Sequence, residues 1–284
     1  MFLLTGCALL DPPAADEAFG NGERAVWVFR EQGGRYVRDA EPLAHGFSSL
    51  GAGVVDDELV VTGLCWWEGC GSMWRRKLLG PPVHALTTRD GVHWEAAMFR
   101  LSGDPTDRVP IDPSIAVTAD GPELWYYAVD AQLRGDPAHH GADHVLARAG
   151  FDGHFADWRA DAVSAPMLAD PSPVVFEGER LLVATSRPGQ EIALWRGDAE
   201  EPERRWSGVS VPHLSVTDAG LELWAQTIVD GHTVAVRATS SDGRQWSGWD
   251  RPLEGLRDCA SPVAATVAGQ RLVLCVDEPL QGPR

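Results

Sequence analysis

The sequence from Ile111 to Asp130 reads IDPSIAVTADGPELWYYAVD, which predicts a β-hairpin. An Asp-Pro pair opens the segment, apolar residues alternate along two runs, and Asp120-Gly121 between the runs is a typical tight turn. The same pattern recurs along the chain with varying fidelity. The other copies are Ser48–Trp66, Asp170–Arg187, Pro212–Val229 and Ala260–Glu278. Five imperfect hairpins in one chain indicate a repeat architecture.

The two ends of the repeat are incomplete, and each supplies what the other lacks. The segment Glu23–Val37 predicts two strands joined by a turn at Gly33-Gly34. The last copy, Ser261–Val276, predicts only two strands. If the N-terminal strands join this last sheet, five sheets close into a ring without exposed edges. We therefore expect an all-β fold, a five-bladed β-propeller over residues 23–284, closed by the N-terminal strands joining the C-terminal blade.

The order of strands in a propeller blade predicts which residues surround the mouth of the central channel. Each blade begins near the axis at one pole, so the residues that open the first strands gather there. These positions are Ser48/Ser49, Asp112, Asp170, Val211 and Ser261. The two long loops Cys65–Pro82 and Asp130–Asp143 join second and third strands and belong to the same pole, where loops on a rigid scaffold usually carry function.

Two seven-residue segments predict turns at the opposite pole. Thr88–Trp94 reads TRDGVHW and Ser240–Trp246 reads SSDGRQW. Both resemble the Asp-box of sialidase-like and related propellers, without the residue between Asp and Gly. The resemblance implies that Asp90 and Asp242 accept backbone hydrogen bonds, that the glycine takes a positive φ, and that the Trp packs between blades. We interpret both aspartates as structural.

A second resemblance concerns the hairpin that opens this section. The motifs IDPS (Ile111–Ser114), TADG (Thr118–Gly121) and LWYY (Leu124–Tyr127) look like the second blade of the five-bladed arabinanase/xylosidase-type glycoside hydrolases, family 43 and its relatives. The resemblance implies that Asp112 would tune the pKa of the catalytic acid and orient it. The matching position for that acid, on the third blade, is approximately Asp170.

The first blade departs from that family. There the resembled enzymes open with an Asp-Pro pair that supplies the general base, whereas His45–Leu50 contains no carboxylate. Asp56 and Asp57 fall in the hairpin turn at the far pole, which leaves Glu68 in the long loop as the candidate third catalytic residue. The alternative interpretation is that the aspartates of the Asp-Pro pairs cap the strand starts and the prolines stiffen them.

Further residues are candidates for substrate binding. Trp66, Trp67 and Trp74 cluster in one long loop, and exposed aromatic faces stack on sugar rings; packing onto the blade is the alternative. Arg187 and His213 complete the set. No cofactor is expected, although some relatives hold a divalent cation near the axis through a His. The loop Asp130–Asp143 is rich in His and Asp but matches no metal motif, so a solvated polar loop is favoured.

The N-terminus predicts lipidation and export. Leu4-Thr5-Gly6-Cys7 resembles the lipobox of bacterial lipoproteins, in which Cys7 would be acylated, although the six preceding residues make a short signal. We interpret residues 1–22 as a truncated-looking signal and tether. The remaining cysteines allow three pairings, of which we favour Cys65–Cys70 with Cys259–Cys275; two reduced thiol pairs in a cytosolic protein are the alternative. The expected location is the bacterial cell envelope, periplasmic or on the outer surface.

The composition of the chain limits the classes of binding partner. A net charge of −17 argues against nucleic-acid binding, because each phosphate contact needs a Lys or Arg. We expect a monomer that contacts the membrane only through its lipid anchor and binds carbohydrate. Three functions stay open: a glycoside hydrolase or its degenerate descendant acting on a neutral polysaccharide, a non-catalytic propeller lipoprotein that binds glycan or protein, and an interaction scaffold with an empty channel.

Overall fold

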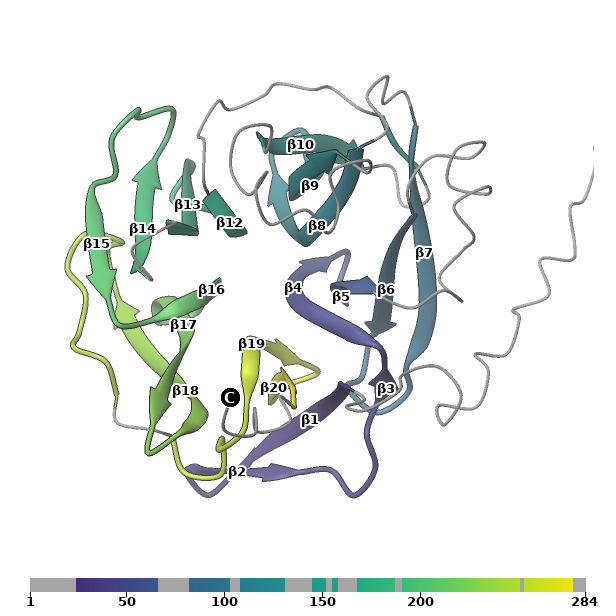
Figure 1. Ribbon diagram of the computed structural model, residues 1–284, viewed down its shortest axis with the longest axis vertical. Helices are drawn as coiled ribbons and strands as arrows, with labels where there is room; N and C mark the ends of the chain where they lie inside the picture. The colour runs from purple at the N-terminus through teal and green to yellow at the C-terminus, as the bar shows by residue number, and fades with distance from the viewer. Residues whose placement is uncertain are drawn as a thin grey trace, which may run out of the picture.

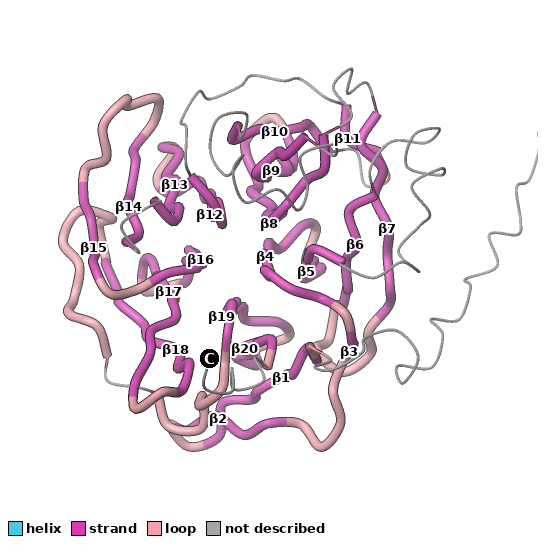
Figure 2. Tube along the Cα trace, in the orientation of Figure 1, coloured by secondary structure: helices cyan, strands magenta, loops and turns pink. Residues whose placement is uncertain are grey.

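The computed structural model describes residues 24–65, 82–102, 108–130, 145–151, 155–157, 168–186, 191–250 and 253–277. All regular secondary structure in these ranges is β-strand. Figures 1 and 2 show the strands as five groups around a central opening, which is a five-bladed β-propeller. No helix long and apolar enough to cross a membrane occurs among the described residues.

Four blades follow one another along the chain. The first contains β4 (Phe47–Val55), β5 (Glu58–Cys65), β6 (Pro82–Thr88) and β7 (Glu95–Ser102). The second contains β8 (Arg108–Thr118), β9 (Gly121–Asp130), β10 (Val145–Phe151) and β11 (Phe155–Asp157). The third contains β12 (Leu168–Phe176), β13 (Glu179–Ser186), β14 (Glu191–Arg196) and β15 (Arg204–Ser207). The fourth contains β16 (Ser210–Thr217), β17 (Gly220–Val229) and β18 (His232–Ser240). In addition, β7 pairs with β11 in parallel and joins the first two blades at their rims.

The fifth blade is built from both ends of the chain. It contains β19 (Ala260–Val267), β20 (Gln270–Val276), β1 (Ala25–Gln32), β2 (Arg35–Arg38) and the short β3 (Ala44–His45). Strand β1 pairs antiparallel with β20, with Val26 opposite Val276. The Asp277 carboxylate accepts hydrogen bonds from the Ala25 backbone N–H at 2.7 Å and from Trp27 Nε1 at 2.9 Å. The predicted closure of the ring is therefore confirmed.

The innermost strand of every blade carries the same irregularity close to its start. The pairing register of β4, β8, β12, β16 and β19 shifts there, as in a β-bulge. One non-glycine residue in each bulge has a positive φ: Ser49 (51°), Asp112 (52°), Asp170 (51°), Val211 (51°) and Ser261 (48°). For a β-branched residue such as Val211 this conformation is rare. These five residues are the strand openings that the sequence predicts.

Apolar layers between neighbouring blades form the core. One layer joins the fifth and first blades through residues such as Val26, Leu59 and Leu274, and another joins the third and fourth blades through residues such as Leu194 and Leu221. Strands β4 and β8 approach so closely that a Cβ atom at Gly51 would overlap the Pro113 carbonyl oxygen. Because burial of this kind stabilises by about 25 cal/mol per Å² of apolar surface, these layers hold the ring together.

The turns at Asp90 and Asp242 have the hydrogen bonds expected of them. Asp90 Oδ1 accepts from the Val92 and His93 backbone N–H groups, and Asp242 Oδ1 accepts from Arg244 and Gln245, all at 2.8 Å. Gly91 and Gly243 have positive φ, and Trp94 and Trp246 pack against core layers. These hydrogen bonds hold the pKa of both carboxyl groups below the usual range; for Asp90 the His93 side chain contributes most.

A disulfide bond joins Cys259 to Cys275, as predicted. Both cysteines are buried, and the bond connects the segment before β19 to the end of β20. The other expected pair lies outside the described residues, since Cys70 falls in 66–81 and nothing is described of the Cys65 side chain.

Loss of the Cys259–Cys275 bond is expected to lower the free energy of unfolding. Its ends are 16 residues apart, and in the loop-entropy account a loop of about that length is worth about 3 kcal/mol. Urea unfolding of the Cys259→Ala/Cys275→Ala protein should therefore show a loss of about 2–4 kcal/mol, with Ile228→Ala, at an exposed side chain, as the control. An unchanged midpoint would contradict this expectation.

Candidate functional site

The two aspartates predicted for the mouth of the channel lie on adjacent inner strands, and the side chain of one contacts the backbone of the other. Asp112 belongs to β8 and Asp170 to β12, the inner strands of neighbouring blades. The Asp170 backbone N–H donates a hydrogen bond to Asp112 Oδ2 at 3.3 Å. The Asp112 residue is 8% exposed, whereas Asp170 is half-buried. Both residues therefore belong to the same pole, with Asp112 behind and Asp170 closer to solvent.

Side-chain oxygens cap the bulges of the next two blades in the same way. The Val211 backbone N–H donates to Thr185 Oγ1 at 3.1 Å, and the Ser261 N–H donates to Gln226 Oε1 at 2.7 Å. Neither Thr185 nor Gln226 was predicted from the sequence as a site residue. A signal existed, because Thr185 and Gln226 occupy equivalent positions of their hairpins, each opposite the residue before the bulge. In the second blade the capping oxygen comes from the bulge residue itself, because Asp112 Oδ2 accepts the hydrogen bond from the Asp170 N–H of the third blade.

The remaining bulge positions carry no ionisable group. Ser49, Val211 and Ser261 complete the ring of five, so its acidic side is confined to the second and third blades. A carboxylate pair beside serine hydroxyl and amide groups can accept and donate hydrogen bonds to a polyhydroxylated ligand. It also provides two acid-base groups, although the first blade contributes none at this ring.

One step further along the channel, polar side chains reach across to the next blade. Ser172 Oγ accepts a hydrogen bond from the Leu214 backbone N–H at 2.7 Å. Ser114 occupies the equivalent position of β8, but the residue that would donate to it is Pro173, which has no N–H. Ser114 Oγ is accordingly buried without a hydrogen-bond partner among the described residues.

His213 lies inside the channel. The residue is 3% exposed, and its Nε2 is 3.1 Å from the Ala264 carbonyl oxygen. Burial, more than the nearby Arg271 charge, lowers the pKa of His213 to about 4. Among the described residues, no group of three or more His, Cys, Asp or Glu that could hold a metal ion is found.

Several candidates from sequence lie outside the described residues. Glu68 and the three tryptophans of the same loop, Trp66, Trp67 and Trp74, fall in 66–81, and Arg187 falls in 187–190. Most of the His- and Asp-rich loop falls in 131–144. Their roles stay predictions.

Two tryptophan clusters between blades were not predicted. Trp224 Nε1 donates to Glu222 Oε2 at 3.0 Å, and the guanidinium carbons of Arg237 and Arg271 each lie 5.7 Å from its ring centroid. Trp125 repeats this arrangement with Glu123, Arg148 and Arg180; its Nε1 donates to Glu123 Oε2 at 3.0 Å. The second arginine of each set comes from the following blade, so each cluster joins two blades.

Comparison with solved structures identifies the architecture. A thermostable family-43 glycoside hydrolase matches with a TM-score of 0.53 and 10% identity over 84% of this chain and 95% of its own. The fold is that of the family-43 glycoside hydrolases. A xylan β-1,4-xylosidase from Bacillus halodurans matches with a TM-score of 0.55 and 17% identity over 84% of this chain and 50% of its own.

An exo-β-1,3-galactanase from Phanerochaete chrysosporium, in complex with β-1,3-galactotriose, matches with a TM-score of 0.52 and 13% identity over 80% of this chain. The present chain spans 59% of that enzyme. No protein-family model and no curated protein sequence matches the chain. At these identities the likeness establishes the propeller fold alone, so any activity has to be argued from the residues of the site.

Proposed function

We propose that the protein binds a neutral oligosaccharide or polysaccharide at the pole that carries Asp112 and Asp170. The observation that supports this proposal is the pairing of the two aspartates on adjacent inner strands, with the Asp170 N–H donating to Asp112 Oδ2. Carboxylates and serine hydroxyls accept and donate the hydrogen bonds that sugar hydroxyls form. The likeness in fold to an exo-β-1,3-galactanase that was solved with β-1,3-galactotriose supports the same class of ligand.

The first blade favours binding without turnover. Inverting hydrolysis needs an acid that protonates the leaving oxygen and a base that activates water. Ser49 occupies the bulge of the first blade, and a serine hydroxyl is a poor base at neutral pH. The competing proposal is hydrolysis with Asp170 as the acid, Asp112 as its positioning residue and Glu68 as the third carboxylate, because two acidic groups are already in place.

Calorimetric titration with a panel of neutral oligosaccharides tests the proposal. Asp112→Asn and Asp170→Asn are each expected to weaken binding at least tenfold, by about 1.4 kcal/mol or more, since each loses a charge-assisted hydrogen bond. Asp57→Asn and Asp120→Asn, in exposed turns at the far pole, are matched controls and should leave affinity unchanged. Binding that is indifferent to the first two substitutions would remove the site from this pole.

Release of reducing sugar, measured on the same panel, separates binding from hydrolysis. The binding proposal expects no release above the rate seen with the Asp112→Asn/Asp170→Asn protein. Turnover that is lost in Glu68→Gln as well as in Asp170→Asn would instead establish the hydrolytic alternative.

We further propose that the protein is anchored by a lipid at the bacterial cell envelope. Support comes from Cys7 in its lipobox-like context and from the disulfide between Cys259 and Cys275, since disulfides persist in oxidising compartments. Labelling of growing cells with a radioactive fatty acid should mark the protein, and Cys7→Ala should abolish the label. Labelling that survives this substitution would contradict the anchor.

A further inference from the structure

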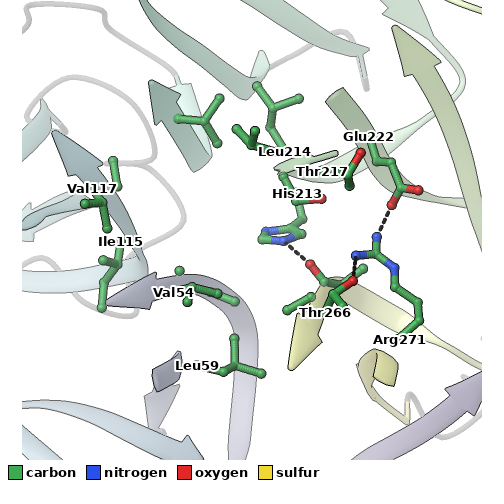
Figure 3. A pocket seen from close by; sticks show the side chains of 18 of the residues that line it. Val54, Leu59, Ile115, Val117, His213, Leu214, Thr217, Glu222, Thr266 and Arg271 are labelled. Carbon is green, nitrogen blue, oxygen red and sulfur yellow. Dashed lines mark hydrogen bonds and ion pairs between the residues drawn. The ribbon is translucent and has the colours of Figure 1, made fainter. Parts of the chain in front are cut away.

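The pole opposite Asp112 and Asp170 contains a cavity that the proposed function does not use. The cavity has a volume of about 800 Å³, which is within the range of small-molecule sites. Its walls are the later halves of the five inner strands, and the turn residues Asp218 and Ala219 also border it. Figure 3 shows these side chains arranged around an open centre.

Valines predominate among the inner-strand residues at the mouth of this cavity. One residue from each inner strand contributes to it, always five positions after the positive-φ residue: Val54, Val117, Val175, Val216 and Thr266. Val54, Val117 and Val216 are 44%, 46% and 49% exposed. These exposed valines recur at equivalent positions around one opening, unlike apolar residues scattered singly over a surface.

Unpartnered polar atoms lie deeper in the cavity. His213 Nδ1 and Ser215 Oγ, both from β16, are buried and have no hydrogen-bond partner among the described residues. The two residues alternate with Leu214 and therefore face the same side of the strand. Because His213 Nε2 contacts a carbonyl oxygen, Nε2 must carry the proton, and Nδ1 of the neutral ring is then an acceptor. A pKa of about 4 keeps the ring neutral at pH 7.

Charge around the cavity disfavours anions. The inner hairpin turns at this end carry exposed acidic residues, namely Asp57, Asp120, Glu177 and Asp218. Two arginines also line the cavity, but both are engaged: Arg271 pairs with Glu222, and Arg237 pairs with Asp250 at 2.9 Å. An incoming carboxylate would therefore meet acidic residues at the mouth and a hydrogen-bond acceptor inside.

We propose that this cavity is a second binding site, for a small amphiphile with an apolar body and an O–H or N–H donor at one end. The donor bonds to His213 Nδ1, which removes the cost of an unsatisfied buried acceptor, and the apolar body lies between the valines of the mouth. Alcohols and amines share this donor chemistry, whereas carboxylates at neutral pH lack it. The inference is independent of the glycan proposal, since the two sites lie at opposite poles.

Titration calorimetry of the full chain with hexan-1-ol, hexylammonium and hexanoate at pH 7 tests it. We expect saturable one-to-one binding of the alcohol or the amine, and binding of hexanoate at least tenfold weaker. Binding of the alcohol alone would assign a neutral donor, and binding of the amine alone a cationic one. Absence of saturable binding by either, up to the solubility limit, would overturn the proposal, as would equal binding of hexanoate.

Three variants locate the site. His213→Phe keeps an aromatic ring but removes the acceptor, and Val216→Gln makes the mouth polar; each should weaken binding of the donor ligand at least fivefold. Val92→Gln, at a valine that is 60% exposed outside the cavity lining, is the matched control and should change nothing. If His213→Phe fails to fold, Val216→Gln still tests whether the ligand binds in this cavity. Affinity unaffected by the substitutions in the cavity, or reduced equally by the control, would overturn the assignment.

Discussion

Replacement of Trp224 by alanine is expected to lower the free energy of unfolding by about 3–5 kcal/mol, the range for large-to-small changes in a protein core. The Trp224 side chain is fully buried. Two arginines lie 5.7 Å from its ring centroid, one of them Arg271 from the fifth blade, and Tyr36 makes a T-shaped contact with it, with ring centroids 6.0 Å apart. The substitution therefore removes packing inside the fourth blade and between that blade and the next.

Electrostatic interactions increase the loss of stability expected for Trp224→Ala. Burial lowers the pKa of the Arg271 guanidinium, because its charge is largely removed from solvent. Loss of the indole ring removes a cation–π contact from this charge, although the ion pair with Glu222 stays. Trp125→Ala should cost a similar amount, because Trp125 is 1% exposed and joins the second and third blades in the same way.

Urea unfolding, followed by circular dichroism, measures these losses. Ile228→Ala is the control, since Ile228 is 65% exposed and its truncation should change stability by less than about 0.5 kcal/mol. A loss for Trp224→Ala no larger than that of the control would show that the indole ring does not couple the two blades.

The second large effect concerns pH. Between pH 6.5 and 4, the wild-type protein is expected to lose about 3 kcal/mol more stability than a His213→Phe variant. The pKa of His213 in the folded protein is about 4 against 6.5 for the unperturbed group, and each pKa unit corresponds to about 1.4 kcal/mol. Below pH 6.5 the imidazole of His213 becomes protonated in the unfolded chain but stays neutral in the folded protein. The free energy of unfolding therefore falls with pH until the folded-state pKa is reached.

Comparison of the two proteins isolates this contribution, because titration of the carboxylates is common to both. The exposed His93 provides a control of opposite sign. Its hydrogen bond to Asp90 raises the pKa of His93, so any stabilisation is present at low pH and lost as pH rises through that pKa. Free energies of unfolding for wild type and His213→Phe that run parallel from pH 7 to 4 would contradict the buried, neutral imidazole.

Local patterns in the sequence predict the blades because hairpin signals are local. Asp120-Gly121 and Gly33-Gly34 fix tight turns between alternating runs, so β8–β9 and β1–β2 could be read from adjacent residues. Closure of the ring follows from counting strands, since the final hairpin lacks partners that β1 and β2 supply. The two acidic bulge positions followed from that topology.

Contacts between distant residues could not be predicted in this way. The partners Glu222 and Arg271 are 49 residues apart, and Gln226 caps a backbone N–H 35 residues away. Such pairs depend on the register of one blade against the next, which no periodicity within a blade determines. The same limit applies to His213. Its place in the sequence, shortly after the bulge residue Val211, did not reveal whether its side chain lies at the mouth of the channel or in the interior, where it is buried.

A crystal structure of the protein with a bound neutral oligosaccharide tests the central claim most directly. The account predicts sugar density at the pole of the five bulges, with ring hydroxyl groups within hydrogen-bonding distance of Asp112 and Asp170. Density confined to the valine-lined cavity at the other pole, or crystals soaked at saturating concentration that show no sugar beside the two aspartates, would contradict it.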